Sequence, residues 1–319
     1  MLQFPFVSLR KNIYAVIVFF DIFDFPLTLE EIKKYVAGKR ESAISVQELL
    51  EQEGSIRHAM INGATYYFLK GRSSIVHTSL QQKQISVKLW EKVHFFLPFI
   101  QTVPFIKMVA VCNTLGYDNA AKDSDIDLFI IAKRGRLFIV RFFTLLLFSL
   151  LGVRRHGKKV AGRFCLSFYI DEDFLNLEPL QLSRQDIYFP FWMITMQPIY
   201  GEGFYHHFMA KNLWLKKYFQ HSMFDNGHFL RPTFLKIFGN FGEWLLKGKF
   251  GNWIENVFYH IQRKRHQKNV VNLSPNASVI VEKNILKFHN VDRRMEIQQK
   301  FEEKWGQIIV GLKNAQRKL

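Results

Sequence analysis

The sequence predicts an α+β fold in which a small mixed β-sheet is flanked by helices. Strand patterns occur within residues 109–132 and at 163–170, with a long apolar helix pattern between them. Three short helix patterns and a hairpin pattern precede them within residues 12–70. Beyond residue 211 the apolar side chains recur at helical spacing. We therefore expect three regions: a small domain with a linker helix at 1–97, a sheet-containing core at 98–205 and a basic helical region at 206–319.

The N-terminal region carries the start and stop signals of short helices. Two residue pairs have the spacing of a capping box: Thr28 with Glu31, and Ser45 with Glu48. In such a box the hydroxyl and the carboxylate each accept a backbone N–H at the start of the helix. Gly38 is suited to end the first of these two helices.

A hairpin is expected next, because Asn62 and Gly63 separate two apolar runs within residues 55–70. Helices followed by a hairpin are typical of a winged helix, and a helix at 84–97 would link it to the core. A winged helix binds DNA or another protein. The last helix before the hairpin is acidic, with residues such as Glu51 that would lie near phosphates in a major groove. We therefore favour a protein contact over DNA reading.

The stretch from Val109 to Ala132 is where the core is expected to form. An apolar strand ends at Asn113 and Thr114, and a second strand begins at Asp125 and Asp127. Side chains alternate along a strand, so the two aspartates share one edge while their apolar neighbours enter the core. Two close carboxylates repel, and a hard divalent cation such as Mg²⁺ or Mn²⁺ neutralises them. The alternative is an aspartate-rich turn that merely precedes a strand.

This stretch resembles the core motif of the nucleotidyltransferase superfamily that includes DNA polymerase beta. The family pattern is a hydrophobic residue, Gly, Gly or Ser, a spacer, and then Asp, hydrophobic, Asp or Glu, hydrophobic. Asn113 and Thr114 stand in the Gly-Ser positions, and ten residues follow. Asp125 and Asp127, each followed by an apolar residue, close the pattern. Asn113 departs from the glycine of the family, whereas Thr114 keeps the hydroxyl.

The resemblance implies a catalytic site and its ligands. Asp125 and Asp127 would ligate Mg²⁺ or Mn²⁺, and the start of a short helix would seat the phosphates of an NTP. The implied nucleotide-binding residues are Asn113, Thr114, Asp123 and Ser124. A third catalytic carboxylate is expected on a neighbouring strand, and Asp171 at the end of the 163–170 strand is the candidate. Strict alternation places Asp171 with Cys165, Ser167 and Tyr169, opposite Phe164, Leu166, Phe168 and Ile170.

The net charge of +17 is unevenly distributed. Residues 133–165 carry 9 basic and no acidic residues, and residues 211–319 carry 20 basic and 8 acidic ones. Such surfaces bind polyanions, so nucleotide phosphates and nucleic acid are expected partners; the alternative is that the charges only solvate helices. The basic loop that begins at Arg154 and Arg155 is suited to a triphosphate or to an acceptor backbone.

Other features narrow the class of protein. The two cysteines, Cys112 and Cys165, form no disulfide framework and suit a reducing cytoplasm. The most apolar run, residues 142–153, is shorter than the roughly 20 residues of a bilayer span, so we expect a buried helix rather than a membrane-associated one. There is no HExxH, Walker A or GxSxG motif, which argues against metalloprotease, P-loop and hydrolase functions.

We expect a cytoplasmic, metal-dependent nucleotidyltransferase that moves a nucleoside monophosphate from an NTP to an acceptor hydroxyl. The alternative is a catalytically degenerate nucleotide- or nucleic-acid-binding regulator or antitoxin-like module, which the departure at Asn113 favours. A third possibility is a nucleic-acid scaffold formed by the C-terminal helices, where tryptophans alternate with basic residues; buried core is the expected use of those tryptophans.

Overall fold

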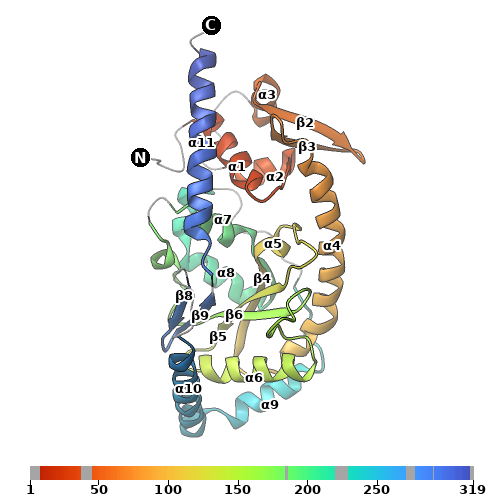
Figure 1. Ribbon diagram of the computed structural model, residues 1–319. Coiled ribbons are helices and arrows are strands. Elements are labelled where there is room, and N and C mark those ends of the chain that lie inside the picture. The colour runs from red at the N-terminus through yellow and green to blue at the C-terminus, as the bar shows by residue number, and fades with distance from the viewer. Residues whose placement is uncertain are drawn as a thin grey trace.

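The computed structural model describes residues 8–36, 45–183, 186–219, 229–270, 277–289 and 291–316. Helices surround two separate sheets, which confirms the α+β class. Figure 1 shows the N-terminal unit at one end of the molecule, the larger sheet in the middle, and helices α6 (Leu137–Leu150), α9 (Lys236–Leu245) and α10 (Gly248–Val270) at the other end. Helix α11 (Arg294–Gln316) runs from the larger sheet to the N-terminal unit.

The N-terminal unit contains three helices and a three-stranded sheet of order β1-β3-β2. Its elements are α1 (Leu9–Asp21), β1 (Leu27–Thr28), α2 (Leu29–Tyr35), α3 (Val46–Gln52), β2 (Ile56–Ile61) and β3 (Ala64–Leu69). Both predicted capping boxes form. The predicted hairpin also forms, and Asn62 and Gly63 both have positive φ at its turn, as a type I′ turn requires. Gly38 lies outside the described residues.

A long helix, α4 (Ile75–Phe96), and the short 3₁₀ helix η1 (Leu97–Thr102) connect this unit to the larger sheet. The predicted linker at 84–97 is the second half of α4.

The larger sheet is mixed and has six strands in the order β7-β4-β5-β6-β9-β8. The strands are β4 (Ile106–Cys112), β5 (Ile126–Ala132), β6 (Phe164–Asp171), β7 (Gln197–Tyr200), β8 (Ser278–Val281) and β9 (Ile285–His289). Only β5 and β6 are parallel among these pairs. The region 206–319, which we expected to be helical, contains helices and also β8 and β9, a hairpin that extends the sheet beside β6.

Each face of the sheet packs against a different group of helices. One face, with Phe129 and Phe168, lies against α1, α7 (Tyr188–Thr195), α8 (Glu202–Lys211) and α11. The other face, with Leu128 and Leu166, lies against α4, η1 and α6. Three shorter helices complete the fold: α5 (Asn113–Gly116), η2 (Glu178–Leu180) and η3 (Leu213–Lys217). In the described part of the chain, no helix has the combined length and apolarity of a bilayer-spanning segment.

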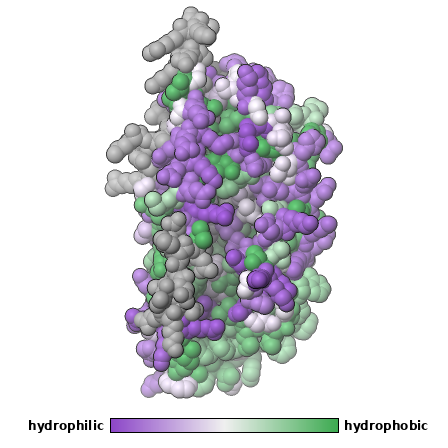
Figure 2. Space-filling view, in the orientation of Figure 1, coloured by the Kyte–Doolittle hydropathy of each residue, from purple (hydrophilic) through white to green (hydrophobic). Residues whose placement is uncertain are grey.

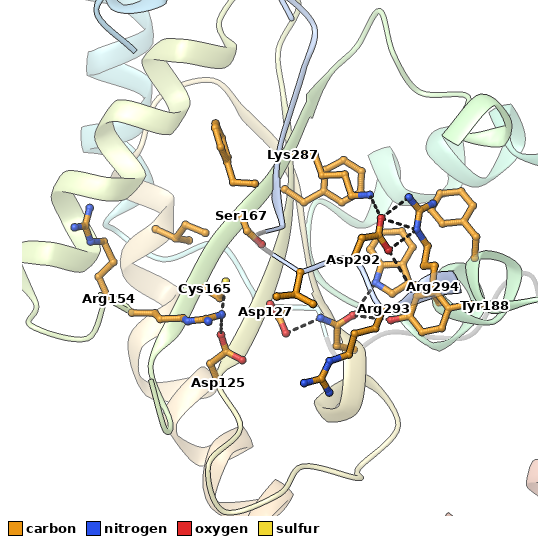
Figure 3. A pocket seen from close by; sticks show the side chains of 18 of the residues that line it. Asp125, Asp127, Arg154, Cys165, Ser167, Tyr188, Lys287, Asp292, Arg293 and Arg294 are labelled. Atoms are coloured by element: carbon orange, nitrogen blue, oxygen red, sulfur yellow. Dashed lines mark hydrogen bonds and ion pairs between the residues drawn. The ribbon is translucent and has the colours of Figure 1, made fainter. Parts of the chain in front are cut away.

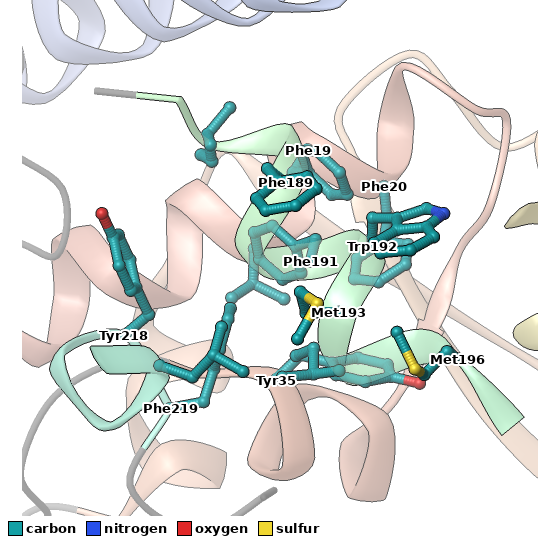
Figure 4. Close-up of a cluster of buried hydrophobic side chains, with 14 of the residues drawn as sticks. Phe19, Phe20, Tyr35, Phe189, Phe191, Trp192, Met193, Met196, Tyr218 and Phe219 are labelled. Carbon is teal, nitrogen blue, oxygen red and sulfur yellow. The ribbon is translucent and has the colours of Figure 1, made fainter. Parts of the chain in front are cut away.

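Aromatic side chains join the N-terminal unit to the sheet. Figure 4 shows Phe19 and Phe20 of α1 against the aromatic residues of α7. The rings of Phe19 and Phe191 stack with centroids 4.1 Å apart, and Trp192 packs edge-on against Phe129 of β5. Offset and edge-on ring contacts add to the free energy of simple apolar burial. Helix α7 is therefore held between α1 and the sheet.

A β-bulge changes the side-chain alternation of β6. The register with β5 runs from Asp127 opposite Cys165 to Phe129 opposite Phe168, so β6 has one extra residue between these pairs. Phe164 and Leu166 consequently pack on the α4 and α6 side, whereas Phe168 and Ile170 pack on the α7 side. The expectation that these four side chains share one face is wrong for this reason.

Candidate functional site

The predicted aspartate pair lines a cavity of about 800 Å³ at the edge of the larger sheet. Figure 3 shows that its walls come from β5, β6, β9, the loop after α6 and the segment before α11. Asp125 and Asp127 point into this cavity, and Ile126 and Leu128 are buried on the opposite face. Strand alternation thus places the two carboxylates together, as expected.

A third side chain, Cys165, lies with the two carboxylates in a candidate cation site. One ligand atom from each of Asp125, Asp127 and Cys165 lies within 4.8 Å of the other two. Cys165 is next to Asp127 because β5 and β6 are parallel and these residues are in register. Burial raises the pKa of the Cys165 thiol, so its sulfur is neutral near neutral pH.

Each carboxylate has a nitrogen partner, and the Cys165 thiol also donates a hydrogen bond to Asp127. Arg155 Nη1 lies 2.6 Å from Asp125 Oδ2, and Asn113 Nδ2 donates to Asp127 Oδ2 at 2.6 Å. Burial, and then repulsion from Asp125, raise the pKa of Asp127 to about 6. A cation between the carboxylates would relieve this repulsion.

Asn113 occupies the turn where the family pattern has glycine. Its φ of +58° is in the left-handed region, which Asn tolerates better than most residues. The side chain is fixed from both sides, because its Oδ1 accepts from Trp192 Nε1 at 3.0 Å and from the Tyr188 hydroxyl at 3.4 Å. The amide therefore fills the position that glycine would leave open.

The other three predicted nucleotide-binding residues do not line the main cavity. Thr114 faces a separate small cavity of about 50 Å³ between α1, α5 and α7. Ser124 closes the turn before β5, since its Oγ accepts from Ala121 N at 2.9 Å and its carbonyl from Gly162 N at 2.7 Å. Asp123 is exposed on the same turn.

Asp171 does not join the aspartate pair. It pairs with Ala132 at the far end of β6, six residues beyond Cys165, which corresponds to roughly 20 Å along a strand. Its carboxylate accepts from Gly135 N at 3.1 Å and from Asp173 N at 3.0 Å, and so stabilises the turn after β5. The structure therefore does not bring Asp171 to the aspartate pair that it was expected to join.

Basic residues from three parts of the chain surround the aspartate pair. The cationic residues that line the cavity are Arg141, Arg154, Arg155, Lys287, Arg293 and Arg294. The acidic ones are Asp125, Asp127 and Asp292, so the cavity has an excess of three positive charges (six minus three). Of the predicted basic loop, Arg154, Arg155 and His156 line the cavity. The Nε atoms of Arg141 and Arg154 are buried and have no hydrogen-bond acceptor within the described residues.

A second charged cluster forms the wall that the C-terminal segments supply. Lys287 Nζ lies 3.4 Å from Asp292 Oδ2, and Arg294 Nη2 donates to the same oxygen at 2.6 Å. Burial, and then the charge of Arg294, lower the pKa of Lys287 to about 8. Burial opposes the ionisation of Asp292, but hydrogen bonds from Arg294 and the charge of Lys287 outweigh it and lower the pKa of Asp292.

Sequence reasoning missed Lys287, Arg293 and Arg294. They lie more than 150 residues after Asp127, and no short motif connects them to it. The alternation of the β9 segment, with Leu286 and Phe288 on one face, is the signal that would have found them. Comparisons of the chain with protein-family models, curated proteins and solved structures find no match.

Proposed function

We propose that the cavity binds a nucleoside triphosphate with a divalent cation and that the protein transfers the nucleoside monophosphate to an acceptor hydroxyl. The observation that carries this proposal is the convergence of Asp125 and Asp127 in a cavity whose remaining walls are rich in arginine and lysine. A polyphosphate chain needs both features, because a divalent cation would neutralise part of its negative charge and cationic side chains would neutralise the rest.

The donor set fits Mg²⁺ or Mn²⁺. Asp125 and Asp127 supply the hard carboxylate oxygens that these ions prefer, and the neutral Cys165 thiol is a poor ligand for Mg²⁺. When bound, the cation supplies charge neutralisation for the pyrophosphate that leaves. Deprotonated Asp127 is required to hold it, so binding is expected to weaken as the pH falls below about 6.

The cationic walls have separate expected tasks. Arg155 already lies on Asp125, and its guanidinium can turn to phosphate oxygens once a cation takes over that carboxylate. Arg154 and Arg141 keep Nε–H donors that no described protein group accepts, and we expect these donors to bind phosphate oxygens. Arg293 lines the wall that the C-terminal segments supply, and we expect its guanidinium to contact the phosphates from that side.

Binding of the nucleotide without transfer is the second candidate function. The position beside Asp127 on β6 holds Cys165 instead of an acid. The third carboxylate that lines the cavity, Asp292, is engaged by Lys287 and Arg294. An acceptor hydroxyl then has no available carboxylate among the described lining residues to take its proton, which favours a regulator that binds nucleotide and releases no pyrophosphate.

The same proposal extends to the macromolecular partner. The N-terminal unit has the element order of a winged helix, and the exposed side of α3 includes Glu48 and Glu51. We infer that this helix contacts a protein rather than DNA. Nucleic acid, if it supplies the acceptor, would bind the basic surface elsewhere, and its affinity would fall steeply with salt.

The test is to measure the melting temperature of the protein with each of the four NTPs, in the presence and in the absence of Mg²⁺ or Mn²⁺. The wild-type protein should gain several degrees in melting temperature with one NTP and only when the metal is present. The Asp125→Asn, Asp127→Asn double variant should lose this gain, and Asp123→Asn, which changes an exposed carboxylate on the neighbouring turn, should keep it. Equal stabilisation of the double variant would remove the proposal. A measurement of pyrophosphate release then distinguishes nucleotidyl transfer from nucleotide binding without transfer.

A further inference from the structure

Helix α9 is packed on the protein by its glycine face. A Cβ atom at Gly239 would lie 2.3 Å from the carbonyl oxygen of Gln101, and one at Gly242 would lie 3.2 Å from Pro104 Cβ. The helix therefore approaches η1 at Gly239 more closely than a side chain there would allow, and it packs tightly on Pro104 at Gly242. The large apolar residues of α9 therefore lie on the other sides of the helix, away from the glycines.

Those apolar residues face outward. Eight large apolar side chains in α9 and its neighbours are each more than half exposed: Phe234, Ile237, Phe238, Phe241, Trp244, Leu245, Phe250 and Trp253. We call this set the apolar end surface. Phe241 and Trp244 stack with ring centroids 5.8 Å apart, as Phe250 and Trp253 do at 6.1 Å. Scattered exposed apolar residues are common, but a cluster of this size marks an interaction site.

The adjoining helices continue this surface. Phe142, Leu146 and Leu150 of α6 are exposed at a spacing of four residues, which makes one stripe along that helix. Helix α6 packs against α10 through Phe142 and Phe258, whose rings stack at 4.2 Å. Figure 2 shows apolar residues gathered at the end of the molecule opposite the N-terminal unit.

The charges around this surface are of one sign. Residues 229–265 contain seven Lys or Arg residues and two Glu. Both glutamates turn inward: Glu243 accepts from Phe105 N at 3.0 Å, and Glu255 accepts from Phe138 N and Ile139 N at 2.9 Å. The exposed charges beside the aromatic residues are consequently cationic, and they include Lys236, Lys247 and Lys249.

We propose that the apolar end surface docks the protein on the face of a phospholipid bilayer that contains anionic lipids. An amphipathic helix with aromatic and aliphatic residues on one side and lysines at its margins lies in the interface plane, where the apolar side chains enter the acyl region and the lysines meet lipid phosphates. Helix α9 has ten residues and does not span the bilayer.

Charge distinguishes this occupant from a second copy of the chain. Two copies that met through the apolar end surface would bring Lys236, Lys247 and Lys249 against the same cations of the partner copy, with both glutamates already engaged inside. Like charges at a desolvated interface oppose association. An anionic lipid surface instead complements both the apolar and the cationic residues.

The test is flotation of the full chain with vesicles of phosphatidylcholine alone or of phosphatidylcholine and phosphatidylglycerol. The protein should float with the anionic vesicles, and high salt should weaken this binding. Lipids brominated along the acyl chain should quench tryptophan emission, and Trp244→Phe with Trp253→Phe should remove most of the quenching, because these are the exposed tryptophans of the surface.

Three variants decide the outcome. Phe238→Ser with Phe241→Ser should lower vesicle binding by about tenfold or more while the melting temperature is kept, since both side chains are exposed. Lys247→Glu should lower binding to anionic vesicles by about fivefold or more. Met60→Ser changes an apolar residue of the N-terminal unit that is more exposed than either phenylalanine; it is the control and should bind as wild type does. Absence of vesicle binding, or binding that the phenylalanine variant leaves unchanged, would overturn the proposal. So would a wild-type dimer in sedimentation that the same variant converts to monomer.

Discussion

At the scale of single residues, Asp127 lies between two cysteines whose thiols carry no charge to balance its carboxylate. Cys112 on β4 and Cys165 on β6 are its neighbours in the sheet. Burial raises the pKa of both thiols, so neither contributes a charge. The Asn113 amide and the neutral Cys165 thiol are the hydrogen-bond donors that support the Asp127 carboxylate in the absence of a cation.

Replacement of Asp127 by Asn should stabilise the metal-free protein at pH 7. Because the pKa of Asp127 is raised to about 6 from an ordinary value of 3.8, the folded protein holds a proton between these pH values that the unfolded chain has lost. The free energy of unfolding thus falls as the pH rises from about 4 to about 6. Asp127→Asn removes this pH-dependent decrease in the free energy of unfolding. The melting temperature of the variant at pH 7 in EDTA should therefore be about 2–4 °C higher than that of the wild type. A lower melting temperature than wild type at pH 7 would contradict this.

Replacement of Asn113 by Gly should raise the pKa of Asp127 further. The substitution removes the amide that lowers this pKa, and glycine accepts the left-handed backbone without strain. Carbon-detected NMR titration of the Asp127 carboxyl gives the direct readout. Trp192 loses its acceptor at the same time, so the free energy of unfolding should fall by about 1 kcal/mol. A pKa of Asp127 that stays at the wild-type value would show that the amide does not control it.

The aspartate pair could be predicted from the sequence, whereas the rest of the cavity could not. Strand alternation is a local property, so Asp125 and Asp127 follow from the pattern alone. Asp171 was misplaced because a single position at the end of a strand does not reveal how far along the sheet its partners lie. Lys287 and Arg293 depend on a long-range strand pairing that no local pattern specifies.

At the scale of elements, glycine contacts determine where strands and helices meet. Gly201 lies between β7 and α8 with φ of +84°. A Cβ atom there would lie 1.9 Å from the carbonyl oxygen of Lys107 on β4. The edge strand β7 therefore joins the sheet only because this position lacks a side chain.

Replacement of Gly201 by Ala should strongly destabilise the protein. The added methyl group clashes with the β4 backbone and requires a left-handed conformation that alanine resists, so we expect a loss of about 2–4 kcal/mol in the free energy of unfolding. Urea denaturation measures it. Gly203→Ala is the matched control, because a Cβ at this helical position meets nothing within 4 Å, and it should be neutral or slightly stabilising. Equal stability of the two variants would refute the close approach.

Local signals explain which elements could be predicted. The capping boxes at Thr28 and Ser45 and the hairpin turn at Asn62 use side chains or backbone preferences within a few residues. The β8–β9 hairpin has no such turn signal and stands between helix patterns, so the local sequence does not predict it. The bulge in β6 was missed because an extra residue is visible only in the pairing with β5.

At the scale of the whole molecule, one buried carboxylate connects the N-terminal unit to the C-terminal helix. Asp21 at the end of α1 accepts from Arg72 Nε at 2.9 Å, and Lys304 of α11 donates to its other oxygen. Asp21 is almost completely buried, so both contacts operate where water competes weakly. The helix that begins at Arg294 is thereby anchored near its middle to the N-terminal unit.

Replacement of Lys304 by Ala should loosen this connection. A charged hydrogen bond to a buried carboxylate is lost, and we expect the free energy of unfolding to fall by about 2 kcal/mol. Hydrogen exchange in α1 and α11 should become faster. Lys300→Ala removes an exposed pair with Glu296 on the same helix and should leave exchange in α1 unchanged. Indistinguishable exchange in the two variants would mean that Lys304 does not hold the helices together.

The origin of the cavity walls has a consequence for biosynthesis. Asp125 and Asp127 leave the ribosome long before Lys287, Arg293 and Arg294, although all five line one cavity. A nascent chain that has folded its central strands still lacks the hairpin beside β6 and the wall that follows it. The cavity is thus complete only after translation has passed residue 294, and a prematurely terminated product would retain the acidic pair without the wall that the later segments supply.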